Sequence, residues 1–129
     1  MSERKKVTAA VIFKNGKVLV AQRSPESSLP NKWEFPGGKM EENETPEDCL
    51  KREIREELNI DIKVKEYLCS SFFDYNHISI ELMAYTCEWQ SGKLKNNEHQ
   101  ALSWLNPEEL RGLDMAPADW PIVEFILKS

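Results

Sequence analysis

The segment that most constrains the fold is a short amphipathic helix near the middle of the chain. Thr45-Pro46 predicts its start, because threonine caps the first turn and proline suits the first helical position. Asn59 predicts its end, since asparagine tolerates the left-handed conformation. Between them an apolar side chain recurs every four residues, at Leu50, Ile54 and Leu58. A helix with one such stripe needs a partner surface that buries it.

Runs rich in β-branched and aromatic residues surround this helix and predict the partner surface. Asn15-Gly16 predicts a hairpin, Asn76-His77 a connection between two long strands, and Ser91-Gly92 another turn. Pro36-Gly37-Gly38 should stop the third run. The strands are predicted at residues 7–13, 17–23, 33–35, 62–73, 78–89 and 98–105, with short and long helices at residues 106–109 and 118–127. This order predicts one α+β domain over residues 1–129, without repeats or linkers.

The net charge of the chain is confined to one segment. The 129 residues carry 22 acids and 17 bases, a formal charge of -5. Residues 41–57 hold eight of the acids and three of the bases, which accounts for the whole surplus. An overall acidic chain excludes a long nucleic-acid strand as partner, since that needs a basic face.

The remaining composition predicts a soluble protein of the cytoplasm. No apolar run approaches the ~20 residues that span a bilayer, so no membrane partner is expected. The N-terminus shows no signal-peptide pattern. Three cysteines without metal-ligand spacing suit a reducing compartment.

Three acids of the predicted helix share one face: Glu53, Glu56 and Glu57. One interpretation is a solvated acidic face with salt bridges, and it accounts for Glu47 with Lys51 and Asp48 with Arg52. It leaves the like charges three and four residues apart unexplained. Clustered carboxylates suit a hard cation such as Mg²⁺, with Mn²⁺ as a substitute. Glu44 and the carbonyls of Gly37-Gly38 could complete its shell.

The spacing of these residues resembles a known motif. Gly38-x5-Glu44-x7-Arg52-Glu53-Ile54-x-Glu56-Glu57-x-Asn59-Ile60 is similar to the Nudix box, G-x5-E-x7-R-E-U-x-E-E-x-G-U, in which U is apolar. Only the last glycine differs, at Asn59. Residues 33–39, 98–102 and 116–121 resemble stretches of MutT-type and CTP-pyrophosphohydrolase-type members. The resemblance implies a Nudix α/β/α sandwich with a mixed sheet, and Mg²⁺-dependent hydrolysis of a nucleoside diphosphate linked to another group.

The resemblance also implies roles for the acidic residues. Arg52 should orient the glutamates, the alternative being an exposed partner of Asp48. The base that activates the attacking water is Glu53 or Glu98. The implied metal ligands are the Gly37 carbonyl, Glu53, Glu56, Glu57 and Glu98.

Four residues are expected to contact substrate: Arg23, Phe35, Lys39 and Asp119. Arg23 could equally be a strand-end surface charge, and Phe35 either stacks a base or belongs to the core. An ionised Asp119 suits the two adjacent donors of guanine, whereas cytosine would require a protonated one. Asp119 could also cap the last helix. His77 and His99 are expected to be ordinary surface or core histidines.

We therefore expect a nucleoside triphosphate to be cleaved to a monophosphate and pyrophosphate. The leading substrate is 8-oxo-dGTP, and CTP or a 5-modified (d)CTP is the alternative. Hydrolysis of ADP-ribose or dinucleoside polyphosphates is a third possibility. A different class is a Nudix-fold sensor that binds a nucleotide without cleaving it. The protein should be a monomer or weak homodimer whose partner is a small-molecule nucleotide.

Overall fold

The computed structural model describes residues 4–75 and 78–128 of the chain. Two α-helices, two 3-10 helices and seven strands are found in these residues. In chain order they are β1 (Arg4–Lys14), β2 (Lys17–Gln22), β3 (Trp33–Glu34), β4 (Gly37–Lys39), α1 (Pro46–Leu58), β5 (Ile60–Tyr75), β6 (Ile78–Gly92), β7 (Ala101–Leu105), η1 (Pro107–Gly112), η2 (Pro117–Asp119) and α2 (Trp120–Lys128).

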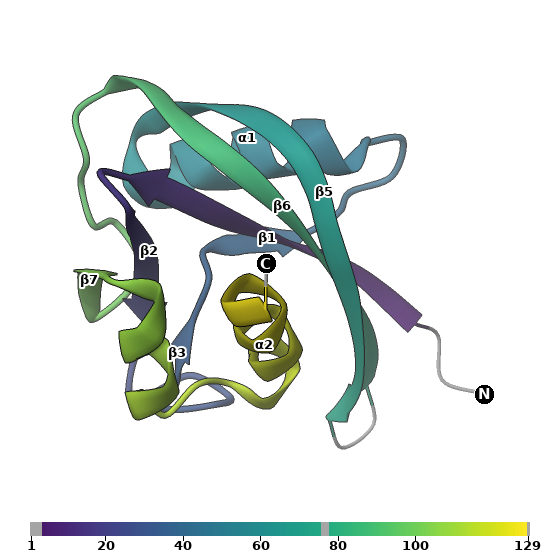
Figure 1. The fold of residues 1–129 in the computed structure, drawn as a ribbon. Coiled ribbons are helices and arrows are strands. Elements are labelled where there is room, and N and C mark those ends of the chain that lie inside the picture. The colour runs from purple at the N-terminus through teal and green to yellow at the C-terminus, as the bar shows by residue number, and fades with distance from the viewer. Residues whose placement is uncertain (1–3, 76–77, 129) are drawn as a thin grey trace.

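The strands form one mixed, curved sheet. The strand order is β3-β2-β1-β6-β5, with β4 added to β1 and β7 added to β2. β1 runs parallel to β6 from the Arg4↔Ser79 pair to the Phe13↔Glu88 pair, and the other pairings are antiparallel. Figure 1 shows α1 and α2 on opposite sides of β1 and β6.

The two faces of β1 explain why its sequence is continuously apolar. Ala9 and Val11 join one core cluster, which includes Ile122 and Val123 of α2. Ala10 and Ile12 join the other cluster, which includes the apolar stripe of α1. Since a strand covered on both faces is hydrophobic at successive positions, β1 is the centre of a three-layer α+β sandwich. The predicted fold class is confirmed.

The predicted boundaries of α1 are also confirmed. The side chain of Thr45 accepts a hydrogen bond from the backbone N–H of Asp48 at 3.1 Å. Asn59 has φ 61°, and its N–H donates to the carbonyl of Arg55. The stripe faces the sheet, since Leu50, Ile54 and Leu58 are fully buried.

Several predicted boundaries are wrong, mostly where strands extend further than their apolar residues. Ser91-Gly92 is the end of β6 rather than a turn, and both residues pair with β5. The third strand does stop before Pro36, as predicted, but Gly37-Gly38 then starts a further strand, β4, which pairs with β1. Glu98 lies before β7, which begins at Ala101. The predicted connection at Asn76-His77 lies outside the described residues.

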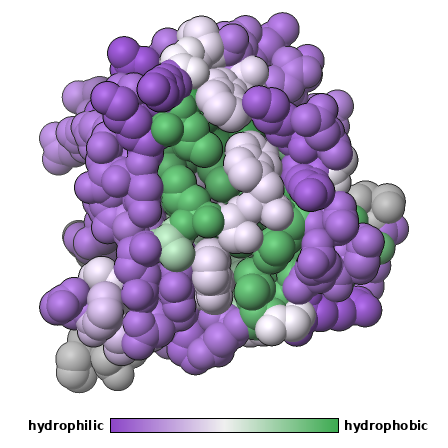
Figure 2. All heavy atoms as spheres, turned by 90° about the vertical axis from the view of Figure 1, so that its left-hand side faces the viewer, coloured by the Kyte–Doolittle hydropathy of each residue, from purple (hydrophilic) through white to green (hydrophobic). Residues whose placement is uncertain are grey.

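The surface beside β2, β3 and β7 is hollowed. Figure 2 views that side of the molecule and shows hydrophobic and intermediate side chains running down a depression between hydrophilic borders. The helices of the described residues are each too short to cross a membrane.

Candidate functional site

Two glycines let β4 run close between β1 and α1. A Cβ atom on Gly37 would come within 2.1 Å of the Thr8 carbonyl oxygen. A Cβ atom on Gly38 would come within 2.3 Å of the carboxylate carbon of Glu53. At Gly37 the clash is with the fixed backbone of β1, so glycine is required there, whereas a Cβ at Gly38 would displace the Glu53 carboxylate of α1.

Arg52 holds the first two glutamates of the motif. Its Nε and Nη2 donate to the two oxygens of Glu44, at 2.6 and 3.0 Å, and its Nη1 donates to Glu53 Oε1 at 2.8 Å. The Arg52 guanidinium lowers the pKa of Glu44 to about 2. Nη2 also donates to the Lys39 carbonyl at 3.1 Å. Arg52 is therefore placed to orient carboxylates and to fasten β4 to α1.

The salt bridges predicted for an ordinary solvated helix face are wrong. The described residues show no ion pair between Asp48 and Arg52, or between Glu47 and Lys51. Arg52 turns instead toward Glu44 and Glu53, because a two-oxygen contact with a carboxylate is stronger than an exposed helical pair.

Glu57 is a buried carboxylate without a hydrogen-bond partner. It is 2% exposed, and neither oxygen is hydrogen-bonded within the described parts of the chain. Burial, and then the charges of Glu98 and Glu53, raises the pKa of Glu57 to about 10. A buried carboxylate beside other carboxylates is stable in its charged form only with a cation nearby.

The other residues expected to bind the metal lie at different distances from Glu57. Ligand atoms of Glu57, Glu98 and His99 lie within 4.8 Å of one another, and the two carboxylates of this group suit a divalent ion. Glu53 neighbours Glu57 closely enough to affect its pKa. The Glu56 side chain is 59% exposed and lies 3.5 Å from Arg52 Nη1. The structure thus brings Glu53, Glu57 and Glu98 together and leaves Glu56 at the edge.

Sequence reasoning missed two residues of the site, Glu34 and His99. Arg23 Nη1 donates to Glu34 Oε1 at 3.0 Å, and His99 Nε2 lies 2.9 Å from Glu34 Oε2. The His99 side chain is only 3% exposed and lies 3.9 Å from Glu57 Oε1. His99 is expected from sequence to be an ordinary surface or core histidine; its side chain is buried, and its position beside Glu98 brings it into the acidic cluster.

The buried side of the site involves Phe35 and Asp119. Phe35 is 3% exposed and packs in the core with α2, so its ring is not available to stack on a base. Its backbone N–H donates to Asp119 Oδ2 at 3.0 Å. Asp119 is the last residue of η2 and directly precedes α2, and within the described residues its side chain is seen to accept from the Phe35 N–H rather than from an N–H of α2. Lys39 has an exposed side chain and offers its carbonyl to Arg52.

Asp119 lies in a strongly perturbing environment. Burial, and then the charge of Glu34, raises the pKa of Asp119 well above its usual range. The Phe35 N–H and the charge of Arg23 act in the opposite direction but are weaker. Asp119 and the Glu34–Arg23 pair are therefore electrostatically coupled, although they are far apart in the sequence.

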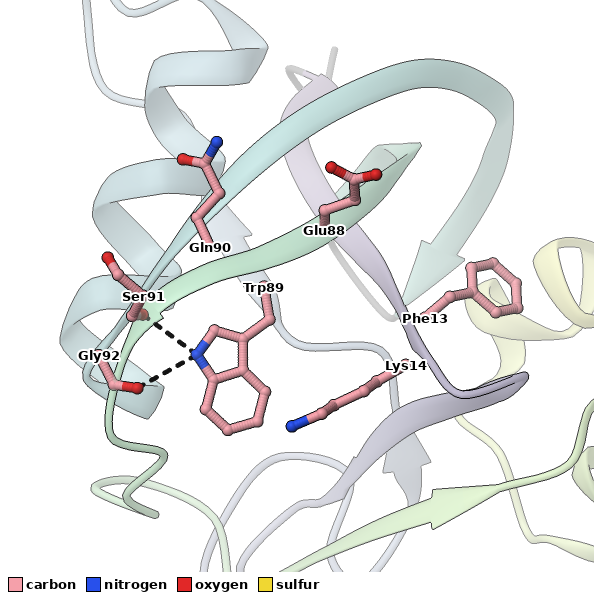
Figure 3. A pocket seen from close by; sticks show the side chains of 7 residues that line it. All are labelled: Phe13, Lys14, Glu88, Trp89, Gln90, Ser91 and Gly92. Carbon is pink, nitrogen blue, oxygen red and sulfur yellow. Dashed lines mark hydrogen bonds between the residues drawn. The ribbon is translucent and has the colours of Figure 1, made fainter.

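A separate surface pocket lies away from these acids, and Figure 3 shows it at the ends of β1 and β6. Trp89 Nε1 donates to the carbonyls of Ser91 and Gly92, and Lys14 Nζ lies 4.1 Å from the centre of the Trp89 ring. Glu88 is the one acid among its described lining residues. The carboxylate cluster is therefore the candidate site.

Comparison with known proteins identifies the fold and its family. The NUDIX domain family model matches residues 4–126. A CTP pyrophosphohydrolase of Escherichia coli is 43% identical over 118 residues, which are 92% of this chain and 87% of that protein. An 8-oxo-dGTP diphosphatase of Proteus vulgaris is 41% identical over 70% of this chain and 85% of its own length.

A solved structure agrees with the sequence comparisons. The solution structure of the E. coli ORF135 protein matches with a TM-score of 0.86 and 40% identity, over 98% of this chain and 91% of that one. Members of the matched family typically depend on divalent metal ions, and the acidic cluster here fits such an ion. The chain belongs to the Nudix hydrolase family and is MutT-like.

Proposed function

We propose that this protein hydrolyses CTP or a 5-modified (d)CTP to the monophosphate and pyrophosphate, with Mg²⁺. This order reverses the one expected from sequence, in which 8-oxo-dGTP led. The relative that acts on CTP aligns with a larger share of the chain, 92%, than the Proteus vulgaris relative that acts on 8-oxo-dGTP, 70%.

The buried Asp119 is the observation that carries the choice of base. Cytosine presents its N4 amino donor beside the N3 acceptor, so a matching side chain must both accept and donate. A protonated carboxyl does this, and burial favours that form of Asp119. Because Oδ2 already accepts from the Phe35 N–H, the proton belongs on Oδ1. Oδ1–H then donates to N3, and the remaining lone pair of Oδ2 accepts from N4.

Guanine is the poorer match for this side chain. Its N1–H and N2 amino group are both donors, so they need a carboxylate that only accepts. Keeping Asp119 ionised would leave a negative charge buried close to Glu34. Because burying that charge is unfavourable, it would weaken the binding of 8-oxo-dGTP.

The acidic cluster supports the hydrolytic part of the proposal. Glu57, Glu53 and Glu98 would hold the metal, with Glu56 and the Gly37 carbonyl as further ligands. When held by these carboxylates, Mg²⁺ would supply the charge that offsets their repulsion of a triphosphate and would polarise the phosphate. Arg52 keeps Glu53 in place. The water proton goes to a carboxylate oxygen of Glu53 or Glu98, and Glu98 has the more exposed side chain.

A nucleotide panel tests the proposal. Pyrophosphate release is measured with Mg²⁺ for CTP, 5-methyl-dCTP, 5-hydroxy-dCTP, dGTP and 8-oxo-dGTP. We expect kcat/KM to be highest for a cytosine nucleotide and to fall at least a hundredfold in Glu57→Gln. A higher kcat/KM for 8-oxo-dGTP would reverse the choice of base. Nucleotide binding without turnover would support the sensor class instead.

Two variants of Asp119 test how the base is recognised. Asparagine offers the same pairing of donor and acceptor as a protonated aspartate, so Asp119→Asn should keep the preference for cytosine nucleotides. Asp119→Leu should lose it, because leucine leaves N3 and N4 unpaired. Loss of the preference in Asp119→Asn would show that the ionised form is the one required.

A further inference from the structure

We infer that His99 is a positioning residue that fixes the substrate-facing Glu34–Arg23 pair relative to the metal-binding Glu57 and Glu98. The kinetic part of this inference rests on the proposed function. Its structural part rests on the contacts of one buried imidazole, whose ring is 3% exposed.

The first contact determines which ring nitrogen carries the proton. Glu34 is ion-paired with Arg23 at 3.0 Å, so its carboxylate is ionised and accepts hydrogen bonds only. His99 Nε2 lies 2.9 Å from the other oxygen of Glu34 and must therefore donate to it. Both carboxylate oxygens of Glu34 are then occupied, one by a guanidinium and one by an imidazole. This fixes the direction in which the Arg23 guanidinium is presented.

The second contact lies on the metal side. His99 Nε2 is 3.9 Å from Glu57 Oε1, beyond hydrogen-bond distance but in contact. Glu57 has no hydrogen-bond partner in the described residues, so the imidazole edge is the polar group that separates it from Glu34. One buried ring thus sets the spacing between a carboxylate that orients Arg23 and a carboxylate that would bind the metal.

His99 also anchors the segment that carries Glu98. This segment has no helix or strand, and it is tied to the end of α1 by Lys95 N–H to the Leu58 carbonyl and Asn97 N–H to the Glu57 carbonyl, both at 2.9 Å. The exposed Glu98 follows directly and is held on its far side by the buried His99. Without this anchor the Glu98 carboxylate would lose its fixed distance from Glu57.

Two substitutions separate the hydrogen bond from the bulk of the ring. His99→Gln places an amide N–H near the position of Nε2 and can still donate to Glu34, whereas His99→Leu fills similar space without a donor. We expect His99→Leu to lower kcat/KM about tenfold and His99→Gln to stay within about threefold of wild type. Equal losses in both variants at temperatures where both are folded would overturn the inference.

A double-variant cycle tests the link to Glu34 directly. If His99 acts in part through Glu34, the loss of activity in the combined Glu34→Gln/His99→Leu variant should be smaller than the product of the two single losses. Losses that multiply would contradict this. The cycle uses ratios of rates, so it can be measured with whichever nucleotide the enzyme hydrolyses and does not depend on the preference for cytosine.

A spectroscopic measurement needs no turnover. The chain has two histidines, so ¹⁵N-histidine labelling with His99→Gln as reference assigns the His99 ring. The inference requires that Nε2 donate to Glu34 and that this hydrogen bond be unchanged when Mg²⁺ is added. A proton on Nδ1 alone, or direct coordination of the imidazole seen as ¹⁴N coupling to bound Mn²⁺, would overturn it.

Discussion

Replacing the ionisable carboxyl of Glu57 with an amide should stabilise the metal-free protein. The folded chain raises the pKa of this carboxyl from 4.5 to about 10, so between these pH values the folded state holds one proton that the unfolded state releases. Stability therefore falls as pH rises, by about 1.4 kcal/mol for each pH unit above about 4.5. At pH 7 this titration lowers the free energy of unfolding by about 3 kcal/mol. The figure is the same for any folded pKa well above 7.

Glutamine has nearly the same shape as a protonated glutamate but does not titrate, so it does not lower the free energy of unfolding as the pH rises. We expect Glu57→Gln to be about 3 kcal/mol more stable than wild type at pH 7 in EDTA, and the difference to fall below about 1 kcal/mol at pH 5. With Mg²⁺ the difference should shrink to within about 1 kcal/mol, because a hundredfold excess over Kd stabilises the wild type by about 2.7 kcal/mol and the variant has lost a ligand.

Urea unfolding at pH 5, 6, 7 and 8, with EDTA or Mg²⁺, measures both effects. Glu66→Gln is the matched control, since Glu66 is exposed on β5 and lies outside the cluster. A metal-free Glu57→Gln protein no more stable than wild type at pH 8 would refute the account of Glu57 as a buried carboxyl that needs a cation. So would an equal response to Mg²⁺ in both proteins.

Three further substitutions test other parts of the site. Gly38→Ala should displace the Glu53 carboxylate and weaken metal binding at least tenfold, measured by Mn²⁺ titration. Arg52→Lys should lower the free energy of unfolding by about 1–3 kcal/mol and reduce turnover, because lysine cannot bind Glu44 through two nitrogens. Asn59→Ala should destabilise the protein by about 1 kcal/mol in urea, since φ is 61° there, whereas Asn59→Gly should not.

Local signals made α1 predictable from sequence. Its cap, its left-handed end and its buried stripe all depend on side chains within the helix or directly beside it. The strand limits were less predictable, because pairing with β5 and β1 holds residues such as Gly92 and Gly37 in strands that their own propensities disfavour. The motif spacing also placed Glu53 and Glu57 on one helix face without any knowledge of the sheet.

The contacts between distant segments could not be predicted in this way. His99 meets Glu34 across 65 residues, and Asp119 meets the Phe35 N–H across 84. Neither partner has a spacing rule that sequence alone could apply. Phe35 looked suitable for stacking because aromatic rings serve both cores and bases, and only the packing of α2 shows that it is buried.

The distribution of charge within the acidic segment explains why a metal would act at one end of α1. Arg52 binds Glu44 and Glu53, so those carboxylates are compensated by the protein itself. Glu57 has no hydrogen-bond donor within the described residues and adjoins Glu98, so its compensation must come from outside the chain. A divalent cation there would neutralise Glu57 and Glu98 and would offer open coordination positions to the phosphate oxygens of a triphosphate, on the side of the helix that Arg52 does not reach. The net charge of -5 is then a means of selecting a nucleotide that arrives together with its metal, rather than a barrier to a polyanion.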